Sequence, residues 1–288
     1  MNRHELATMQ GRLSPREGGL FQSFPATQWR EEFARAAECG LQRIEWIIDD
    51  PDWESNPLMT DAGRIEIAGL SRRTGVKVRS ACADLFIPRP LHSAPAAEQR
   101  ARETALKQMI AAAGAAGLEH MDIPFVDASA IGTAAAFETV VSVFRQAAPL
   151  AVRAGLKLCL ETSLEPAAFR DLLERIGHDS VGANHDIGNS ASLGYGAKDE
   201  FAAVGRWISC VHIKDRVRGG GTVPLGTGSA DFAATFAELR ACAYKGHFVL
   251  QIARGTEGDE VAWIKKNTAY ARGLIGRLEA EHGSRAQG

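Results

Sequence analysis

Residues 157–186 read KLCLETSLEPAAFRDLLERIGHDSVGANHD, and they contain the structural unit that repeats along the chain. The segment begins with a short apolar run, 157–161, continues with an amphipathic helical pattern over 166–176, and ends in a second short run, 181–186. Short apolar runs bounded by turn residues favour buried strands, whereas the pattern between them favours a helix. A strand–helix–strand unit of this kind predicts parallel strands joined by a right-handed crossover.

The same alternation extends over the whole chain. Expected strands cover 4–9, 43–48, 76–82, 119–125, 157–161, 181–186, 207–213 and 247–252. Expected helices cover 28–38, 61–73, 96–116, 132–154, 166–176, 198–205, 231–242 and 260–281. Eight strand–helix units predict an α/β fold, a single (β/α)₈ TIM barrel over residues 1–281 with a frayed C-terminal tail at 282–288. The alternative is a doubly wound sheet that binds a dinucleotide, but MQGRLSPREGG (9–19) after the first strand lacks the G-x-G-x-x-G spacing.

The composition excludes several classes of protein. Of the 288 residues, 45% are hydrophobic and 24% are charged, which excludes a disordered or fibrous chain. A net charge of -2 argues against a nucleic-acid partner, and no apolar run is long enough to cross a membrane. The N-terminus has no secretory signal, and the five cysteines are odd in number and widely spaced, as in a reduced cytoplasmic protein.

Four possible metal ligands stand at the ends of the last four expected strands. They are Glu161, Asp186, His212 and Gln251. Active sites of barrels lie at the C-terminal ends of the strands, so we expect these side chains to converge. Carboxylate, imidazole and amide oxygen favour one divalent ion, Mn²⁺ first, with Mg²⁺, Co²⁺ or Zn²⁺ as alternatives. The competing interpretation of each residue is a hydrogen-bonded polar side chain at a strand terminus.

The chain resembles a family at these positions. The segments that carry the resemblance are MQGRLSP (9–15), IEWIIDDPDWESNPL (44–58), LET (160–162), HDIGNSASLGY (185–195), VHIKD (211–215) and VPLGTGSADF (223–232). They are similar to the sugar-phosphate isomerases and epimerases of the xylose-isomerase-like TIM barrels, including L-ribulose-5-phosphate 3-epimerase and D-tagatose 3-epimerase. The resemblance spans nearly the whole chain, and the segments at strands five to eight are its most specific part.

The resemblance implies a metal-dependent isomerase or epimerase that acts on a sugar or sugar phosphate. In the family a Glu, an Asp, a His and a second Glu bind the metal. A glutamate carboxylate removes a proton from the carbon next to a carbonyl, and an enediolate forms. The first three fall on Glu161, Asp186 and His212, with Glu161 as the base. The fourth falls on Gln251, which departs from the family because an amide cannot exchange a proton at neutral pH. Two alternatives stay open: a lyase similar to inosose dehydratase, and a non-catalytic sugar-binding barrel.

Other residues near the strand ends are weaker candidates. His185 is either a second catalytic group or a core histidine, and Asn189 stands where many relatives carry a histidine that touches the sugar. Lys214 and Arg216 follow His212, and Arg12 follows the first strand, so each is a candidate for substrate binding. The resemblance also implies a homodimer or homotetramer.

Overall fold

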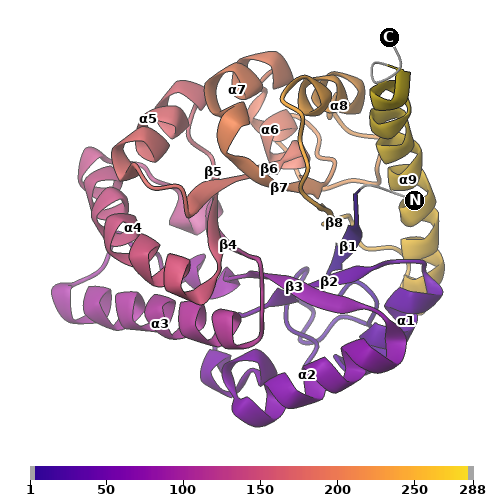
Figure 1. Cartoon of the computed structure of the whole chain (residues 1–288), viewed down its shortest axis with the longest axis horizontal. Coiled ribbons are helices and arrows are strands. Elements are labelled where there is room, and N and C mark those ends of the chain that lie inside the picture. The colour runs from indigo at the N-terminus through magenta and orange to yellow at the C-terminus, as the bar shows by residue number, and fades with distance from the viewer. Residues whose placement is uncertain (1–3, 285–288) are drawn as a thin grey trace. The chain divides into compact units, whose positions relative to one another are not determined.

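The structure is a computed structural model that describes residues 4–284. In these residues, parallel strands follow one another in chain order from β1 to β8 around a closed barrel (Figure 1). The strands are β1 (Leu6–Met9), β2 (Arg43–Ile47), β3 (Lys77–Cys82), β4 (His120–Phe125), β5 (Lys157–Thr162), β6 (Val181–Asp186), β7 (Ile208–Ile213) and β8 (Phe248–Leu250). The predicted (β/α)₈ fold is confirmed, with strand limits within a few residues of those expected.

Helices follow the strands along the chain. They are α1 (Glu31–Glu38), α2 (Asp61–Thr74), α3 (Ala96–Ala115), α4 (Ala134–Ala154), α5 (Pro166–Ile176), α6 (Ile187–Leu193), α7 (Ala197–Val204), α8 (Phe232–Ala241) and α9 (Glu260–Ser284). Helix α9 ends three residues beyond the predicted end at 281, and residues 285–288 of the expected tail lie outside the described part of the chain. No helix within the described range has a stretch long and apolar enough to cross a membrane.

Sequence patterns did not predict α6. This helix covers seven residues, IGNSASL, in which glycine, asparagine and serines are weak helix formers. Its first turn is stabilised by Asp186, whose side chain caps the helix by accepting a hydrogen bond from the Asn189 backbone N–H at 2.7 Å. The helix therefore depends on one cap at the end of β6 more than on intrinsic propensity.

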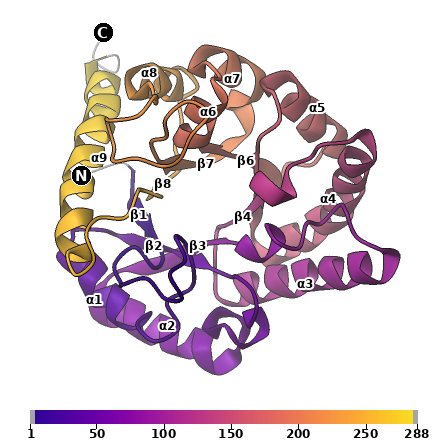
Figure 2. The same cartoon turned by 180° about the vertical axis from the view of Figure 1, so that it is seen from behind.

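The chain divides into two compact units. Unit 1 comprises Met1–Ile44 and His185–Gly288, and unit 2 comprises Glu45–Asn184. In unit 1, β8 pairs in parallel with both β1 and β7, and α8 lies beside α9 (Figure 1 and Figure 2). In unit 2, β3 pairs with β4 and β4 with β5, while α3 lies beside α4 (Figure 2).

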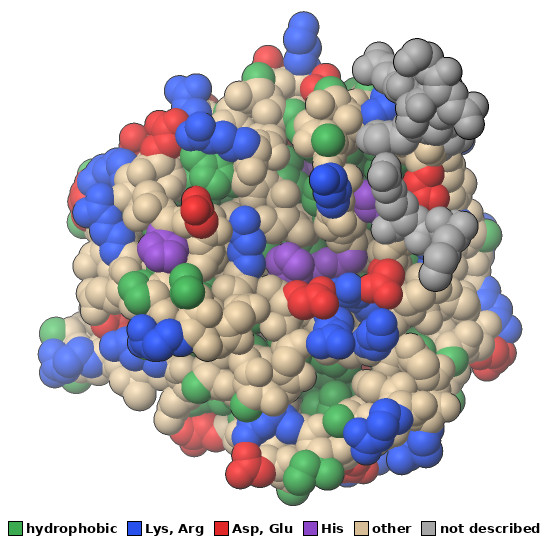
Figure 3. Space-filling model, viewed as in Figure 1, with side chains coloured by type: hydrophobic (Ala, Val, Ile, Leu, Met, Phe, Trp, Pro, Cys, Tyr) green, Lys and Arg blue, Asp and Glu red, His purple; other side chains and the backbone are tan. Residues whose placement is uncertain are grey.

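Buried aromatic side chains pack between strands and helices within each unit. In unit 1 the ring of Phe248 stacks on Phe236 with centroids 5.3 Å apart, and in unit 2 Phe125 meets Phe144 edge-on at 5.8 Å. None of the five cysteines forms a disulfide in the described residues, and Cys242 is exposed whereas the other four are buried. On the face shown in Figure 3, Lys and Arg side chains are scattered with Asp and Glu among them.

Candidate active site

Unit 1 brings four polar side chains together at the ends of three strands. Asp186 is the last residue of β6, His212 the penultimate residue of β7, and Gln251 directly follows β8. The Gln251 N–H donates to the Ile213 carbonyl at 3.1 Å, which extends the β7–β8 ladder and places Gln251 next to Lys214. Asp186, His212, Lys214 and Gln251 are all buried. We call these four residues the lysine cluster.

Lys214 joins two of the predicted metal ligands. Its Nζ donates to Asp186 Oδ2 at 3.2 Å and to Gln251 Oε1 at 3.1 Å. His212 Nδ1 lies 4.0 Å from the same Asp186 oxygen. Gly188 makes room for this arrangement, because a Cβ at that position would lie 2.7 Å from Lys214 Cγ. The sequence predicted a substrate-binding role for Lys214. In the structure its ammonium lies between one carboxylate oxygen, of Asp186, and one amide oxygen, of Gln251.

Asn189 and Arg216 extend the lysine cluster on one side. The Asn189 backbone N–H donates to Asp186 Oδ1, and its side-chain oxygen accepts a hydrogen bond from Arg216 Nη1 at 2.8 Å. Arg216 Nε also donates to the Gly220 carbonyl at 3.0 Å, which anchors the loop after β7. The sequence-predicted residues Asn189 and Arg216 are therefore in contact with each other.

Arg12 connects with the lysine cluster through one glutamine. Gln22 Oε1 accepts hydrogen bonds from Arg12 Nη2 at 2.9 Å and from Gln251 Nε2 at 3.3 Å. Arg12 Nε donates to the Ile252 carbonyl at 3.1 Å, directly after Gln251 in the chain. Gln22 was not predicted to belong to the site, since nothing in its local sequence indicates that it lies beside β8.

His185 is separate from the lysine cluster, although it precedes Asp186. Its ring is buried and meets the Phe201 ring of α7 edge-on, with centroids 5.0 Å apart. Burial lowers the pKa of His185 to about 4, so the imidazole is neutral at physiological pH. Alternation of side chains along β6 explains the separation, because successive residues of a strand point to opposite faces.

Asp215 anchors the glycine-rich loop after β7. One carboxylate oxygen accepts the backbone N–H groups of Gly226 and Gly228, both at 2.9 Å, and the other accepts that of Ala230 at 3.1 Å. Asp215 is 1% exposed. Three backbone hydrogen bonds engage both oxygens of the carboxylate, so Asp215 holds the loop at residues 226–230 in position.

Unit 2 holds a second polar group, which contains Glu161. Glu161 lies on β5, where its Oε2 accepts a hydrogen bond from Asn184 Nδ2 at 3.3 Å. A carboxylate oxygen of Asp122, on β4, lies within 4.8 Å of one of Glu161. Cys82 Sγ lies 3.1 Å from Asp84 Oδ1 and 3.4 Å from Asp122 Oδ2. We call Cys82, Asp84, Asp122 and Glu161 the carboxylate cluster.

The carboxylate cluster concentrates negative charge. The pKa of the Cys82 thiol is raised well above its ordinary value, first by burial and then by the charges of Asp84, Asp122, Glu45 and Glu161. Sequence analysis missed Asp122, because it lies within a strand and not at its end. An acidic residue in the otherwise apolar run MDIPF is the signal that could have found it, since a buried carboxylate requires polar or charged partners.

Both clusters contain donors that fit a divalent metal. Carboxylate and amide oxygens suit hard cations, and an imidazole nitrogen suits several transition metals. In the lysine cluster, the ammonium held by Asp186 and Gln251 indicates that these two oxygens favour a cation.

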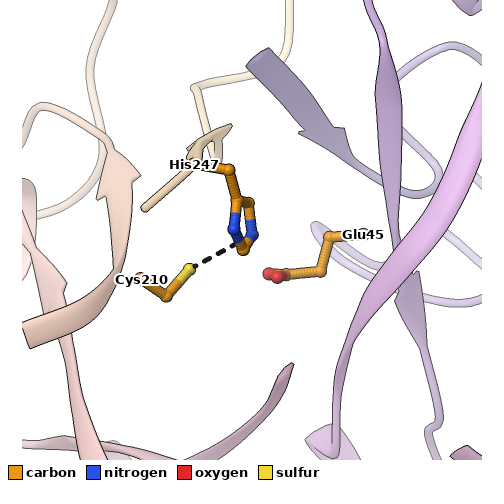
Figure 4. A group of neighbouring side chains, drawn as sticks. All are labelled: Glu45, Cys210 and His247. Carbon is orange, nitrogen blue, oxygen red and sulfur yellow. Dashed lines mark hydrogen bonds between the residues drawn. The ribbon is translucent and has the colours of Figure 1, made fainter. Parts of the chain in front are cut away.

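Unit 1 contains another pair of buried polar side chains, Cys210 and His247, nearer the N-terminal end of β7 than His212. Cys210 lies two residues before His212 on β7, and its Sγ lies 3.7 Å from His247 Nε2, as the dashed line in Figure 4 marks. Tyr244 secures this region by donating a hydrogen bond from its hydroxyl to the His247 carbonyl at 2.6 Å. Cys210 and His247 are both buried.

Comparison with known proteins identifies the family. The sequence profile of the xylose isomerase-like TIM barrels matches residues 33–274. The chain belongs to this family. No curated protein sequence matches the chain.

Several solved structures share the fold of this chain. D-allulose 3-epimerase from Methylomonas sp., in complex with D-allulose, is 18% identical, with a TM-score of 0.73 and coverage of 95% of this chain and 98% of its own. The IOLI protein with a bound zinc atom is 16% identical, with a TM-score of 0.75 and coverage of 96% and 99%. A barrel from Mycobacterium smegmatis in complex with magnesium is 17% identical, with a TM-score of 0.70 and coverage of 95% and 97%.

Proposed function

We propose that the protein is a divalent-metal-dependent isomerase or epimerase of a small sugar or sugar phosphate. The observation that carries this proposal is the presence of buried oxygen and imidazole ligand atoms at the ends of β5, β6 and β7. A sugar epimerase and two metal-bound proteins share the fold, which supports the proposal. Glu161, Asp186, His212 and Gln251 are the proposed ligands, and Mn²⁺ is the favoured ion. When bound, the metal polarises the substrate carbonyl.

Glu161 is the proposed base. A buried carboxylate can remove the proton on the carbon next to a carbonyl, which produces an enediolate and leaves a neutral acid to return the proton. Asn184 donates a hydrogen bond to Glu161 Oε2 and so orients the carboxylate. Lys214, Arg216, Asn189 and Arg12 are the proposed substrate-binding residues; the two arginines and the lysine suit the charge of an enediolate or of an anionic substituent.

Gln251 bears on the type of reaction. Epimerisation requires a proton on the opposite face of the sugar, and an amide cannot supply one. The buried, neutral His185 packs against Phe201, and Asp215 is engaged by three backbone N–H groups. These contacts favour a one-base reaction, either aldose–ketose isomerisation or the elimination of a β-hydroxyl by a lyase. The non-catalytic sugar-binding barrel is the remaining alternative. The enzyme is further proposed to be a cytoplasmic homodimer or homotetramer.

Metal binding and proton exchange test the proposal in two steps. Chelator-treated protein is titrated with Mn²⁺ by calorimetry, and we expect about one ion per chain, with affinity reduced at least tenfold in His212→Ala. His178→Ala is the matched control, because His178 lies before β6, at the opposite end of the strand from Asp186. Equal Mn²⁺ affinity in His212→Ala and the parent would exclude the proposed ligand set.

Proton exchange is then measured with a panel of aldoses, ketoses and their phosphates in deuterated water. We expect metal-dependent incorporation of deuterium at the carbon beside the carbonyl. Products identify the subtype: an inverted stereocentre indicates an epimerase, a moved carbonyl an isomerase, and loss of water a lyase. Metal-loaded protein that binds a sugar without any exchange would instead support the sugar-binding barrel.

A further inference from the structure

Unit 1 contains a pocket whose lining includes one proposed substrate-binding residue, Arg12, and two further arginines that the proposed function does not use. Its volume is about 180 Å³, and its lining includes Arg12, Arg16, Arg254, Glu257, Glu260 and Trp263. Arg12 and Arg16 belong to the loop after β1, and Arg254 belongs to the loop after β8. Since β1 and β8 pair in parallel, both loops leave the same edge of the sheet. Two arginines of one loop therefore share a cavity with a third, Arg254, that is distant in sequence.

The arginine heads are held by backbone carbonyls. Arg254 Nε donates to the Phe21 carbonyl at 2.9 Å, and its Nη1 donates to the Ser14 carbonyl at 3.0 Å. Arg12 Nη1 donates to the same Phe21 carbonyl at 3.1 Å. Neutral carbonyls orient a guanidinium without cancelling its charge. Among residues 4–284, neither Arg16 nor Arg254 forms an ion pair with a carboxylate, so both keep their charge for another partner.

Like charges lie close together in this pocket. The pKa of Arg254 is lowered, first by burial and then by the neighbouring positive charge of Arg16. Glu32 and Glu260 oppose this effect, and Glu260 Oε1 also accepts the Gly258 N–H at 3.1 Å. Three arginines face two lining glutamates, and α9 starts at the same place, so its N-terminal dipole adds to the positive charge. An anion between the guanidinium groups relieves their repulsion.

A buried carboxylate holds the loop after β1 in shape. Glu32 accepts hydrogen bonds from the backbone N–H groups of Gly11 at 3.1 Å and Leu13 at 3.2 Å, and from the Ser14 hydroxyl at 3.0 Å. Gly11 has a φ of 77°, and a Cβ there would lie 2.7 Å from the Ser23 carbonyl oxygen. The backbone on either side of Arg12 is thus fixed before any ligand arrives, which lowers the entropic cost of binding.

We propose that this arginine pocket binds the oxyanion group of a substrate, the phosphate of a sugar phosphate or the carboxylate of a sugar acid. Its volume accommodates a four-oxygen anion, given that a water molecule occupies about 30 Å³ in the liquid. Gln22 links Arg12 of the pocket to Gln251 of the lysine cluster, so the pocket adjoins the candidate active site within unit 1. The choice of a sugar rests on the proposed function, whereas the binding of an oxyanion does not.

Binding of simple anions to chelator-treated protein tests the pocket without turnover and without a metal that could itself hold phosphate. The probes are inorganic phosphate, D-glucose 6-phosphate, D-glucuronate and D-glucose, measured by calorimetry. We expect an anion to bind, and its affinity to fall at least tenfold in Arg254→Gln and in Arg16→Gln, because each removes a charge-assisted hydrogen bond. Arg277→Gln, an exposed arginine on α9, is the matched control and should bind as the parent does.

The pattern of binding identifies the substrate class. Preference for the two phosphates indicates a phosphomonoester, and preference for D-glucuronate indicates a sugar acid. Arg254→Lys should retain part of the affinity, because it keeps the charge but loses the fork of donors. If Arg254→Gln fails to fold, the exposed Arg16 still provides the test. Absence of anion binding by the parent, or equal affinity in Arg16→Gln, would overturn the proposal and leave the metal and exchange experiments unaffected.

Discussion

The lysine cluster of unit 1 and the carboxylate cluster of unit 2 differ in the charges that lie next to their buried carboxylates. In unit 1, Asp186 already has a cation: Lys214 Nζ lies 3.2 Å from it and 3.1 Å from Gln251 Oε1. In unit 2, carboxylates gather around Cys82, and burial first and then their charges raise the pKa of its thiol. The first arrangement provides its own positive charge, whereas the second favours a cation brought from solution. We infer that metal affinity depends mostly on Glu161, and that Lys214 competes with the metal for Asp186.

The largest expected effect is on turnover. Glu161→Gln should lower kcat by about 10²–10⁴, because the amide keeps the shape of the side chain but cannot accept the substrate proton. Steady-state kinetics with saturating Mn²⁺ measure it. Glu165→Gln is the matched control, since Glu165 is exposed, lies four residues further on and makes no side-chain cap for α5. A Glu161→Gln enzyme with parental kcat would remove Glu161 from the chemistry and weaken the contrast between the two clusters.

A smaller effect concerns the stability of unit 1 as a function of pH. Burial raises the pKa of Glu32 from 4.5 to about 7, and the hydrogen bonds from Gly11, Ser14 and Leu13 only partly oppose this. A raised carboxyl pKa contributes stability below about pH 4.5 that is lost as the pH rises through about 7. The full shift corresponds to about 3 kcal/mol, at about 1.36 kcal/mol per pKa unit.

Glu32→Gln should therefore flatten the pH dependence of unfolding between pH 4.5 and 7 relative to the parent. Denaturant melts at several pH values measure the free energy of unfolding, and other titrating groups, such as Glu200 with a pKa raised to about 7 by burial, cancel in the difference. Parallel profiles for the two proteins would show that Glu32 titrates normally. This experiment measures how a buried acid of unit 1 titrates when backbone N–H groups and a hydroxyl, in place of a lysine, donate to its oxygens.

The smallest expected effect is on metal affinity, and its measurement tests directly whether Lys214 competes with the metal for Asp186. Lys214→Met keeps much of the apolar stem but removes the ammonium from Asp186 and Gln251, and it should tighten Mn²⁺ binding about tenfold, or about 1.4 kcal/mol. Calorimetric titration of chelator-treated protein measures this, with Lys198→Met on the exposed surface of α7 as the control. Weaker metal binding in Lys214→Met would mean that the lysine supports the metal ligands rather than competing with them.

Most of the fold could be predicted from the sequence, because strands and helices leave local periodic patterns. The limits of β6 and α5 match the expected ranges, and those of β7 and α3 differ by one residue. Helix α6 could not be predicted in this way, since it depends on the cap from Asp186. The family resemblance stated from the motifs is confirmed by the match over residues 33–274.

The candidate site was predictable where a residue stands at the end of a strand. Glu161, Asp186 and His212 lie within one residue of those ends, although their part in metal binding stays a proposal. Asp122 was missed because it is inside β4. His185 was predicted to be either a catalytic group or a core histidine; its ring packs against Phe201 of α7, and a catalytic role stays a prediction. Sequence order tells which residue ends a strand, but the face that a terminal side chain takes depends on its neighbours in space.

By itself, the sequence determined the alternation of strands and helices and the residue types at the strand ends, because both follow from local patterns along the chain. Only the tertiary structure decided that Lys214 lies between Asp186 and Gln251, and that Arg16 and Arg254 share a pocket. The partners in each case lie on different strands or loops, many residues apart. Their contact is set by the register of β7 and β1 against β8, by the cap that folds α6, and by the absence of a side chain at Gly188.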